Sequence, residues 1–213
     1  MFLRKSGVAL SAALLTSTIA ASGASAAGTT QVSCSNGVVS VTAAAGTTNA
    51  ISVVDAGAGK YTIQDIGNGA TLGYSAGGCL SGISNYTANK GTITVSGTIA
   101  RVNVSSGDLT DVVNLDGLAG KAAIYGGNGD DLLYAGNGNT TINGGAGNDD
   151  IEGGAGDDLI AGDIGVDTIS AEGGNDTIFA SDGYADTIDG GSGTDNANVD
   201  IELSVVNVET VTF

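Results

Sequence analysis

The chain has 213 residues, enough for one domain or two small ones, and its formal net charge at pH 7 is −17, from 23 acidic and 6 basic residues. Nucleic acids and anionic membranes bind clustered lysine and arginine, so this balance excludes them as partners and favours cations. No run after residue 26 keeps a 3.6-residue apolar period over a helical length, so an all-β chain is expected.

The first 26 residues have the layout of a secretory signal peptide. Arg4 and Lys5 precede an apolar stretch at 8–20, and residues 24–26 (Ala-Ser-Ala) offer a cleavage site. The stretch is short for a membrane span and no second one follows, so no membrane insertion is expected. We therefore expect a secreted, extracellular chain that begins near Ala27; a buried N-terminal helix is the alternative.

Residues 27–105 are predicted to form a β-rich N-terminal region or cap. Short runs of β-branched residues alternate with small polar ones at 38–43, 50–55, 60–65 and 91–97. The two cysteines of the chain, Cys34 and Cys79, are either one disulfide or two separate buried thiols. No C-x-x-C pair or cysteine–histidine cluster supports a zinc site.

From residue 126 to residue 198 the sequence repeats every nine residues. The sixth position is an aspartate and the eighth an aliphatic residue in nearly every unit, and the stretch holds 15 acidic residues and no lysine or arginine. The units are GGNGDDLLY, AGNGNTTIN, GGAGNDDIE, GGAGDDLIA, GDIGVDTIS, AEGGNDTIF, the ten-residue ASDGYADTID, and GGSGTDNAN.

This spacing predicts a coil of two units, stacked into two parallel sheets. Glycines at positions 1, 2 and 4 allow a tight six-residue turn, and the last three residues form a short strand whose eighth residue faces inward. One aliphatic residue per nine, at about 1.5–3 kcal/mol each, cannot offset the backbone entropy of the unit, about 1–2 kcal/mol per residue. The sixth-position aspartates would also repel one another in two columns, so a divalent cation is expected to complete the fold.

Calcium fits the expected cation site better than other metals do. It takes six to eight carboxylate and carbonyl oxygens in adaptable geometry, and two stacked turns could supply about six. Magnesium prefers a strict octahedron and retains its waters, while zinc and copper prefer histidine or cysteine.

The units resemble the G-G-x-G-x-D-x-U-x nonapeptide of the repeats-in-toxin (RTX), or haemolysin-type, calcium-binding β-roll, where U is a large apolar residue. The units at Gly126, Gly144 and Gly153 match every defined position. The resemblance implies a parallel β-roll in which each Ca²⁺ is shared by two repeats two units apart. The first gives the carbonyls of positions 2 and 4 and its aspartate, and the second gives the carbonyls of positions 1 and 3 and its aspartate.

The implied ligand sets follow from that pattern. They are Gly127, Gly129 and Asp131 with Gly144, Ala146 and Asp149; Gly145, Gly147 and Asp149 with Gly162, Ile164 and Asp167; Gly154, Gly156 and Asp158 with Ala171, Gly173 and Asp176; and Glu172, Gly174 and Asp176 with Gly190, Ser192 and Asp195. Two sets depart from the pattern: Gly153, Ala155 and Asp158 face a repeat with Thr140 in place of aspartate, and an inserted residue disturbs the pairing of Asp167 with Asp186. About four good sites and one or two poor ones are expected.

The resemblance extends more loosely to both sides. Residues 106–114 resemble a decayed repeat with Asp111 and Val113 in place, and residues 117–125 keep the phase but carry Ala122 where an aspartate belongs. Residues 205–213 resemble the strand that closes such rolls. The predicted organisation is a signal peptide (1–26), the N-terminal region (27–105), calcium-binding repeats (106–198) and a C-terminal capping strand (199–213).

No catalytic activity is expected. Residues 73–77 match G-x-S-x-G, but a serine hydrolase needs a histidine and the chain has none. A pair of glycosidase carboxylates is also disfavoured, because the turn period accounts for the acidic residues.

The predicted function is a secreted calcium-binding β-roll that folds when it meets calcium and then acts as a structural or interaction module for an extracellular protein or surface. One alternative is an accessory protein to a separate secreted enzyme. Another is a surface adhesin or ice-binding roll, suggested by threonines at the outward seventh position that are expected to form a partial row: Thr141, Thr168, Thr177 and Thr187.

Overall fold

The structure is a computed structural model that describes residues 29–35, 37–43, 46–57, 59–67, 71–74, 92–96, 99–200 and 204–213. Every regular element in these residues is a β-strand, which confirms the all-β prediction. The described residues contain no helix that could span a membrane. The expected signal peptide and Cys79 lie outside the described residues.

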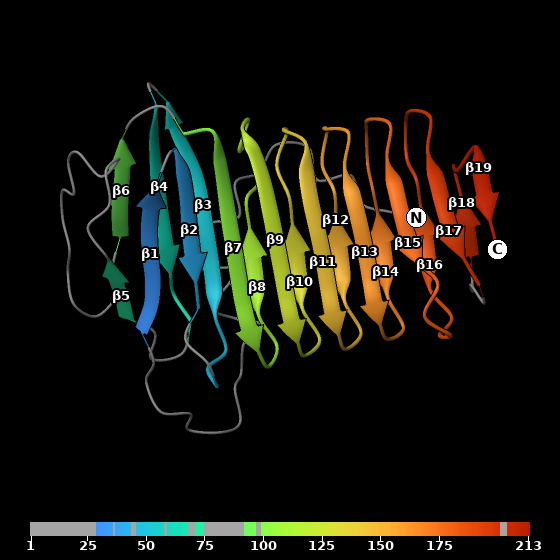
Figure 1. The fold of residues 1–213 in the computed structure, drawn as a ribbon, viewed down its shortest axis with the longest axis horizontal. Helices are drawn as coiled ribbons and strands as arrows, with labels where there is room; N and C mark the ends of the chain where they lie inside the picture. The colour runs from blue at the N-terminus through green and yellow to red at the C-terminus, as the bar shows by residue number, and fades with distance from the viewer. Residues whose placement is uncertain are drawn as a thin grey trace.

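The strands form two sheets that face one another along the length of the molecule (Figure 1). The ten-stranded sheet contains, in spatial order, β19 (Thr210–Thr212), β17 (Asn196–Val199), β15 (Thr177–Ala180), β13 (Leu159–Ile164), β11 (Thr140–Ala146), β9 (Lys121–Asn128), β7 (Arg101–Asp108), β2 (Val38–Thr42), β1 (Thr29–Ser35) and β5 (Thr71–Tyr74). The nine-stranded sheet contains β18 (Ser204–Val206), β16 (Thr187–Asp189), β14 (Thr168–Ser170), β12 (Asp150–Glu152), β10 (Leu132–Tyr134), β8 (Val112–Asn114), β3 (Ala50–Gly57), β4 (Lys60–Asp65) and β6 (Thr92–Ser96).

From β7 onward the chain alternates between the two sheets, and every strand pairs in parallel with the strand one coil away. Ile142 of β11, for example, pairs with Ile124 of β9 on one side and with Ile160 of β13 on the other. The pairs keep an 18-residue offset where the repeats are regular, so two nonapeptides make one coil. The predicted parallel β-roll is therefore confirmed.

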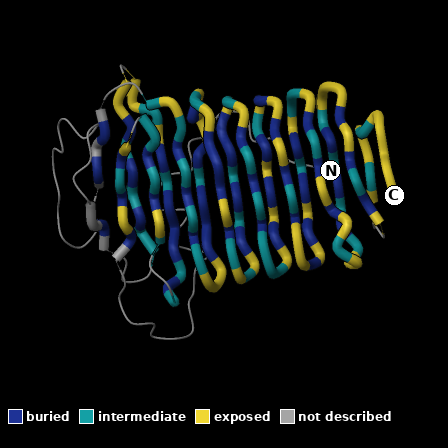
Figure 2. The backbone as a smooth tube through the Cα atoms, in the orientation of Figure 1, coloured by how far each residue is buried: buried dark blue, intermediate teal, exposed yellow. Residues whose placement is uncertain are grey.

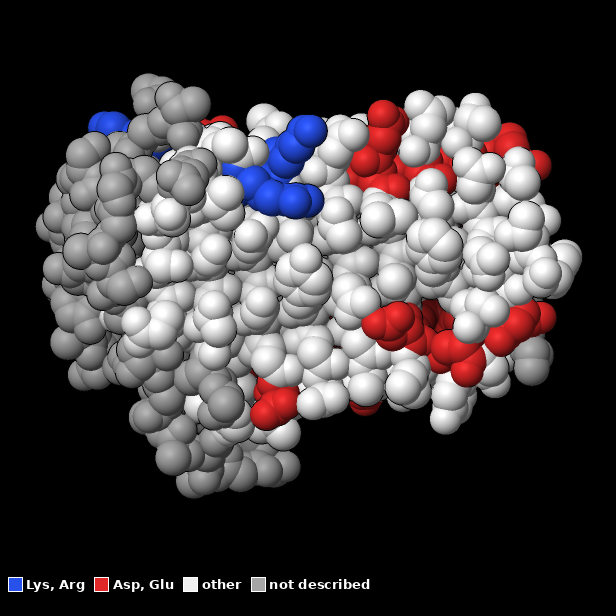
Figure 3. Space-filling view, viewed as in Figure 1, with Lys and Arg blue, Asp and Glu red and all other residues white. Residues whose placement is uncertain are grey.

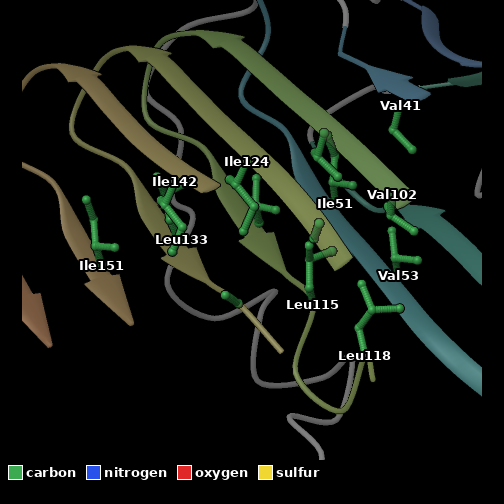
Figure 4. Close-up of a cluster of buried hydrophobic side chains, with 14 of the residues drawn as sticks. Val41, Ile51, Val53, Val102, Leu115, Leu118, Ile124, Leu133, Ile142 and Ile151 are labelled. Carbon is green, nitrogen blue, oxygen red and sulfur yellow. The ribbon is translucent and has the colours of Figure 1, made fainter. Parts of the chain in front are cut away.

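The aliphatic residue at the eighth position of each repeat forms the core of the roll. Ile124, Leu133 and Ile142 converge in the space between the sheets (Figure 4). All three are at most 1% exposed, and buried residues recur in coil after coil along the roll (Figure 2). The row continues through both sheets with Ile151, Ile160, Ile169, Ile178 and Ile188, all equally buried. The core is thin because the eighth residue is the main large apolar side chain that each short strand turns inward, with small additions such as Ala180 of β15 and Val199 of β17.

The strands of the two sheets differ in length, which the repeat alone does not predict. In the nine-stranded sheet β10, β12, β14 and β16 have the expected three residues. In the ten-stranded sheet β9, β11 and β13 run on into the following turn, because pairs such as Gly145 with Gly127 and with Asp163 continue the ladder.

The N-terminal strands pair mostly antiparallel among themselves, apart from the parallel pair β1–β5, and they join the roll through parallel pairs. β1 pairs antiparallel with β2, β4 pairs antiparallel with both β3 and β6, and β2 and β3 pair in parallel with β7 and β8. Each sheet therefore continues from the N-terminal strands into the roll. Residue 105, the predicted end of the N-terminal region, lies inside β7. Cys34 of β1 is disulfide-bonded, and Cys79 is the other cysteine in the sequence.

The tail forms one more coil in place of a single closing strand. β18 pairs in parallel with β16, and β19 pairs in parallel with β17. The tail thus extends both sheets by one strand each.

Candidate functional site

The turns of the roll form two edges. The first edge consists of the turns that leave the ten-stranded sheet (106–111, 126–131, 144–149, 162–167 and 180–186), and the second edge of those that leave the nine-stranded sheet (135–140, 153–158, 171–176 and 190–195). Glycines shape both. Gly145 has a φ of 114°, and a Cβ added to it would collide with the carbonyl oxygen of Gly127 in the coil before. Glycine at this position lets successive turns approach this closely without strain.

Each sixth-position aspartate is buried in its turn and bonded to the coil before it. Asp149 Oδ1 accepts a hydrogen bond from the backbone N–H of Asp131 at 2.9 Å, and Asp167 Oδ1 accepts one from Asp149 at 2.8 Å. The aspartates form one column on each edge, and none is more than 3% exposed. The first-edge column is Asp111, Asp131, Asp149, Asp167 and Asp186, and the second-edge column is Asp158, Asp176 and Asp195.

The second carboxylate oxygen, Oδ2, is buried and has no hydrogen-bond partner in any of these eight aspartates. In the five repeats that begin with glycine (Gly126, Gly144, Gly153, Gly162 and Gly190), this oxygen lies beside the glycine, where a side chain is lacking. A Cβ built on Gly153 would be 2.9 Å from Asp158 Oδ2 and 2.7 Å from the carbonyl oxygen of Ala171, one coil further on. An unpaired buried carboxylate oxygen beside a carbonyl oxygen is unfavourable unless a cation lies between them.

The same convergence recurs on the first edge. Asp131 Oδ2 and the carbonyl oxygen of Gly144 meet beside Gly126, and Asp149 Oδ2 and the carbonyl oxygen of Gly162 meet beside Gly144. These are pairs of oxygens that the RTX ligand pattern assigns to one ion. The two oxygens can lie this close to the backbone because the glycine at position 1 has no Cβ.

Burial raises the pKa of these carboxyl groups far above that of an exposed aspartate. Desolvation is the largest cause for Asp131, whose pKa rises to about 7; the backbone N–H of Asp111 partly opposes it, and the charges of Asp149 and Asp130 add to it. The pKa rises to about 8 for Asp111, to about 7 for Asp158 and Asp167, and to about 6 for Asp149 and Asp176. Without a cation, the columns therefore resist full ionisation at neutral pH.

The donor set fits calcium. It consists of carboxylate and carbonyl oxygens alone, as a hard cation requires, and it lacks the histidine or thiolate that zinc prefers. In the described residues no three or more acidic, histidine or cysteine side chains gather around one point. An ion would therefore be held by two successive carboxylates of a column, with backbone carbonyls completing the shell.

Other predicted ligands also serve the ladder between coils. The carbonyl oxygens of Ala146 and Ile164 accept hydrogen bonds from Gly129 N–H at 2.7 Å and Gly147 N–H at 2.8 Å. The carbonyl oxygen of Ser192 accepts one from Gly174 N–H at 3.0 Å. A carbonyl oxygen has a second lone pair, so these bonds leave one position for an ion.

Two irregular repeats differ in their effect on the columns. The insertion at 180–189 is absorbed in the turn, since Asp186 Oδ1 still accepts a hydrogen bond from Asp167 N–H at 2.7 Å. Thr140 lies in the second-edge column in place of an aspartate, and its backbone N–H donates to Asp158 Oδ1 at 2.6 Å. Gly153 and Ala155 therefore face a turn with one carboxylate fewer.

The structure adds two acidic residues that the repeat pattern does not assign to a site. Asp111 has the same bond and the same unpaired Oδ2 as the other column members, and Gly107 and Leu109 beside it have φ angles of 107° and 75°. The phase of Asp111 and Val113 in the sequence is the signal that points to it. Glu209 continues the second-edge column, where its Oε2 accepts a hydrogen bond from Asp195 N–H at 2.6 Å, but no sequence period reaches it.

The expected threonine row is divided between the two sheets. Thr168 and Thr187 are neighbours in the nine-stranded sheet, while Thr141 and Thr177 lie in the ten-stranded sheet with Leu159 between them. The prediction of one partial row was wrong, because alternate repeats face opposite sides of the roll. Of the G-x-S-x-G match, Gly73 and Tyr74 fall in β5 and residues 75–77 lie outside the described residues.

Comparisons with known proteins agree with this geometry. The family of RTX calcium-binding nonapeptide repeats matches in four copies, at residues 115–142, 125–160, 134–169 and 161–197. No curated protein and no solved structure matches the chain. Residues 115–197 of this chain are therefore a run of RTX calcium-binding nonapeptide repeats folded as a β-roll.

Proposed function

We propose that this chain is an exported calcium-binding β-roll whose repeats complete their fold when Ca²⁺ fills the two aspartate columns. One observation carries the proposal: eight buried aspartates each leave one carboxylate oxygen without a partner, at the turns where calcium ligands are expected. A divalent cation at these positions supplies the charge that the columns lack and joins each coil to the next.

The columns define which sites should be strong. Two buried aspartates flank each of six intervals: Asp111–Asp131, Asp131–Asp149, Asp149–Asp167 and Asp167–Asp186 on the first edge, and Asp158–Asp176 and Asp176–Asp195 on the second. The interval from Thr140 to Asp158 has one carboxylate and should bind more weakly, because calcium affinity follows the number of charged ligands.

Calcium binding should be cooperative along each column. Inner aspartates such as Asp149 would contact two ions, so filling one interval orders a carboxylate for the next. Repeat arrays gain most of their stability from contacts between neighbours, which makes folding steep in calcium. With affinities of roughly 10⁻⁴–10⁻³ M, as extracellular calcium modules have, the roll would stay expanded inside a cell and fold outside it.

The stoichiometry tests the proposal directly. Isothermal titration of the chelated chain with calcium should give about six strong sites, and magnesium should not reproduce the heat. Binding of one or two ions, or equal binding of magnesium, would contradict the assignment of both columns.

Export is a separate part of the proposal and has its own test. It is supported by the signal-peptide layout of residues 1–26. Expression in a bacterium followed by mass spectrometry of the exported chain should find an N-terminus near Ala27. An uncleaved chain that stays in the cytoplasm would contradict export and leave calcium binding untouched.

A further inference from the structure

Two cations lie side by side at the start of the roll, on a molecule that is otherwise strongly acidic. Arg101 is the first residue of β7 and Lys121 the first residue of β9, and the two are register partners in adjacent parallel strands. Adjacent strands are about 4.8 Å apart, so the two positive charges are neighbours. On the face shown in Figure 3, the basic atoms lie over the N-terminal half of the molecule and most acidic atoms lie towards the C-terminal end.

Most of the hydrogen-bonding capacity of these cations is unused. Arg101 Nη2 makes two long bonds, to the carbonyl oxygen of Ala122 and to Thr141 Oγ1, both at 3.4 Å. Its Nε is buried and has no partner, although a guanidinium has five N–H donors. Neither Arg101 nor Lys121 forms an ion pair with a carboxylate of the described residues. Two like charges side by side repel each other, and an anion that bridges them relieves this repulsion.

A groove of about 310 Å³ opens next to this pair. Arg101 and Lys121 line it on the N-terminal side. The coils that follow contribute neutral polar residues, among them Asn139, Thr141 and Asn175, and two carboxylates, Asp157 and Asp158. Its volume falls within the range of sites for small ligands, roughly 300–1,000 Å³.

Calcium does not account for the cationic end. The column positions beside it are Val102 and Ala122, neither of which offers a carboxylate, and the nearest aspartate of that edge is Asp158. The second-edge column therefore begins only after the two cations. The groove meets the column only at its first members, Thr140 and Asp158, and the cationic side of the groove has no column carboxylate beside it. The ligand of the two cations must therefore be explained by other side chains.

From this arrangement we infer a binding site for a sugar acid, that is, a hydroxyl-rich ligand with a single carboxylate. The guanidinium of Arg101 and the ammonium of Lys121 hold the carboxylate, for which the planar fork of arginine is well suited. The amide of Asn139 and the hydroxyl of Thr141 bind ring hydroxyls. Asp157 accepts hydrogen bonds from hydroxyls, and the carboxylates of Asp157 and Asp158 repel a second negative charge, which selects against polyanions.

NMR of the Arg101 side chain tests the site at atomic resolution. The chain has two arginines, Arg4 and Arg101, so Arg4→Gln leaves one arginine Nε–H resonance. Titration of this variant with D-glucuronate, at constant saturating calcium, should shift that resonance along a saturable curve with a dissociation constant on the order of 1 mM. D-Glucose, which lacks the carboxylate, should not shift it.

Matched variants separate the site from general charge effects. Lys121→Gln should weaken glucuronate binding at least fivefold, whereas Lys60→Gln, the same change at an exposed lysine of β4, should leave it unchanged. Equal loss in both variants would overturn the site in favour of non-specific attraction. Equal shifts with sulfate or with glucose would overturn the sugar-acid assignment, and no shift with glucuronate would overturn the proposal.

Discussion

At the scale of single residues, the two oxygens of each column aspartate have different roles. Oδ1 of Asp149 is bonded to the backbone of the previous coil, while its Oδ2 is buried without a partner. Asp130, one position earlier than the column member Asp131, is exposed, and its carboxylate accepts a hydrogen bond from Asn148 N–H at 2.8 Å. Neighbouring aspartates of one turn therefore differ in burial and in free oxygens, which makes them a matched pair for experiment.

Asp131→Asn should raise the calcium concentration at the folding midpoint roughly tenfold, because the change removes a charged ligand from two intervals of the first edge. Asp130→Asn removes the same charge from the same turn and should move the midpoint little. The measurement is far-UV circular dichroism against free calcium for both variants. Equal shifts would show that overall charge matters and that the column does not.

Gly145→Ala should disrupt the coil that contains it. Its φ of 114° costs an alanine about 1–3 kcal/mol, and the new Cβ would also strike the carbonyl oxygen of Gly127. Gly173→Ala is the control, because Gly173 lacks a positive φ and the nearest atom to a new Cβ is Ser192 Oγ at 3.2 Å. Urea unfolding at saturating calcium should show a clear loss for the first variant only; similar losses would contradict the close-approach argument.

At the scale of elements, each edge is held by two ladders that run in opposite directions. Sixth-position carboxylates accept hydrogen bonds from the coil before, as Asp149 does from Asp131. Fifth-position side chains accept them from the coil after, as Asp130 does from Asn148 and Asn148 does from Val166. Only the sixth-position ladder is buried, so only its carboxylates lose hydration on folding and require a cation in return.

The nine-residue period was sufficient to predict the coil, the inward eighth residue and the two aspartate columns. The burial of the aspartates was not predictable from it, because a carboxylate at a turn is ordinarily solvated and its direction depends on the backbone. The longer strands β9, β11 and β13 depend on pairing between coils. Glu209 lies in the tail, where the sequence has no repeat, so its place in the second-edge column can be seen only in the structure.

Mild acid should partly replace calcium. The column carboxyl groups have pKa values raised from 3.8 to about 6–8 in the folded chain, so the folded state binds protons more tightly than the unfolded state. Stability of the calcium-free roll is therefore greatest at low pH and falls as pH rises through these values. In chelator, the urea midpoint should be higher near pH 5.5 than near pH 8; a midpoint that rises with pH would contradict the buried columns.

At the scale of the whole molecule, the two halves are stabilised differently. The N-terminal strands have a wider apolar core, with Ile51, Ile63 and Ile93 all fully buried. Asn49, whose side chain is neutral, ends the first-edge column on that side. Its backbone N–H donates a hydrogen bond to Asp111 Oδ1. The later coils have one aliphatic residue per strand and both acidic columns. The N-terminal half should therefore be a preformed template on which calcium adds the later coils.

Hydrogen exchange tests whether the N-terminal half is structured before calcium binds. In chelator, the amides of β2, β3, β4 and β7 should be protected while those of β12 to β17 exchange quickly, because only the latter coils depend on calcium. Calcium should then protect the later coils. Uniform protection, or uniform exchange along the chain, would contradict a template at the N-terminal end.

The central claim is that calcium completes the fold, and a far-UV circular dichroism titration of the chelated chain tests it most directly. The account predicts a cooperative gain of β signal near millimolar calcium that magnesium does not produce. A full β signal already present in chelator and unchanged by calcium would show that the repeats fold unaided. The buried carboxylates would then require another explanation.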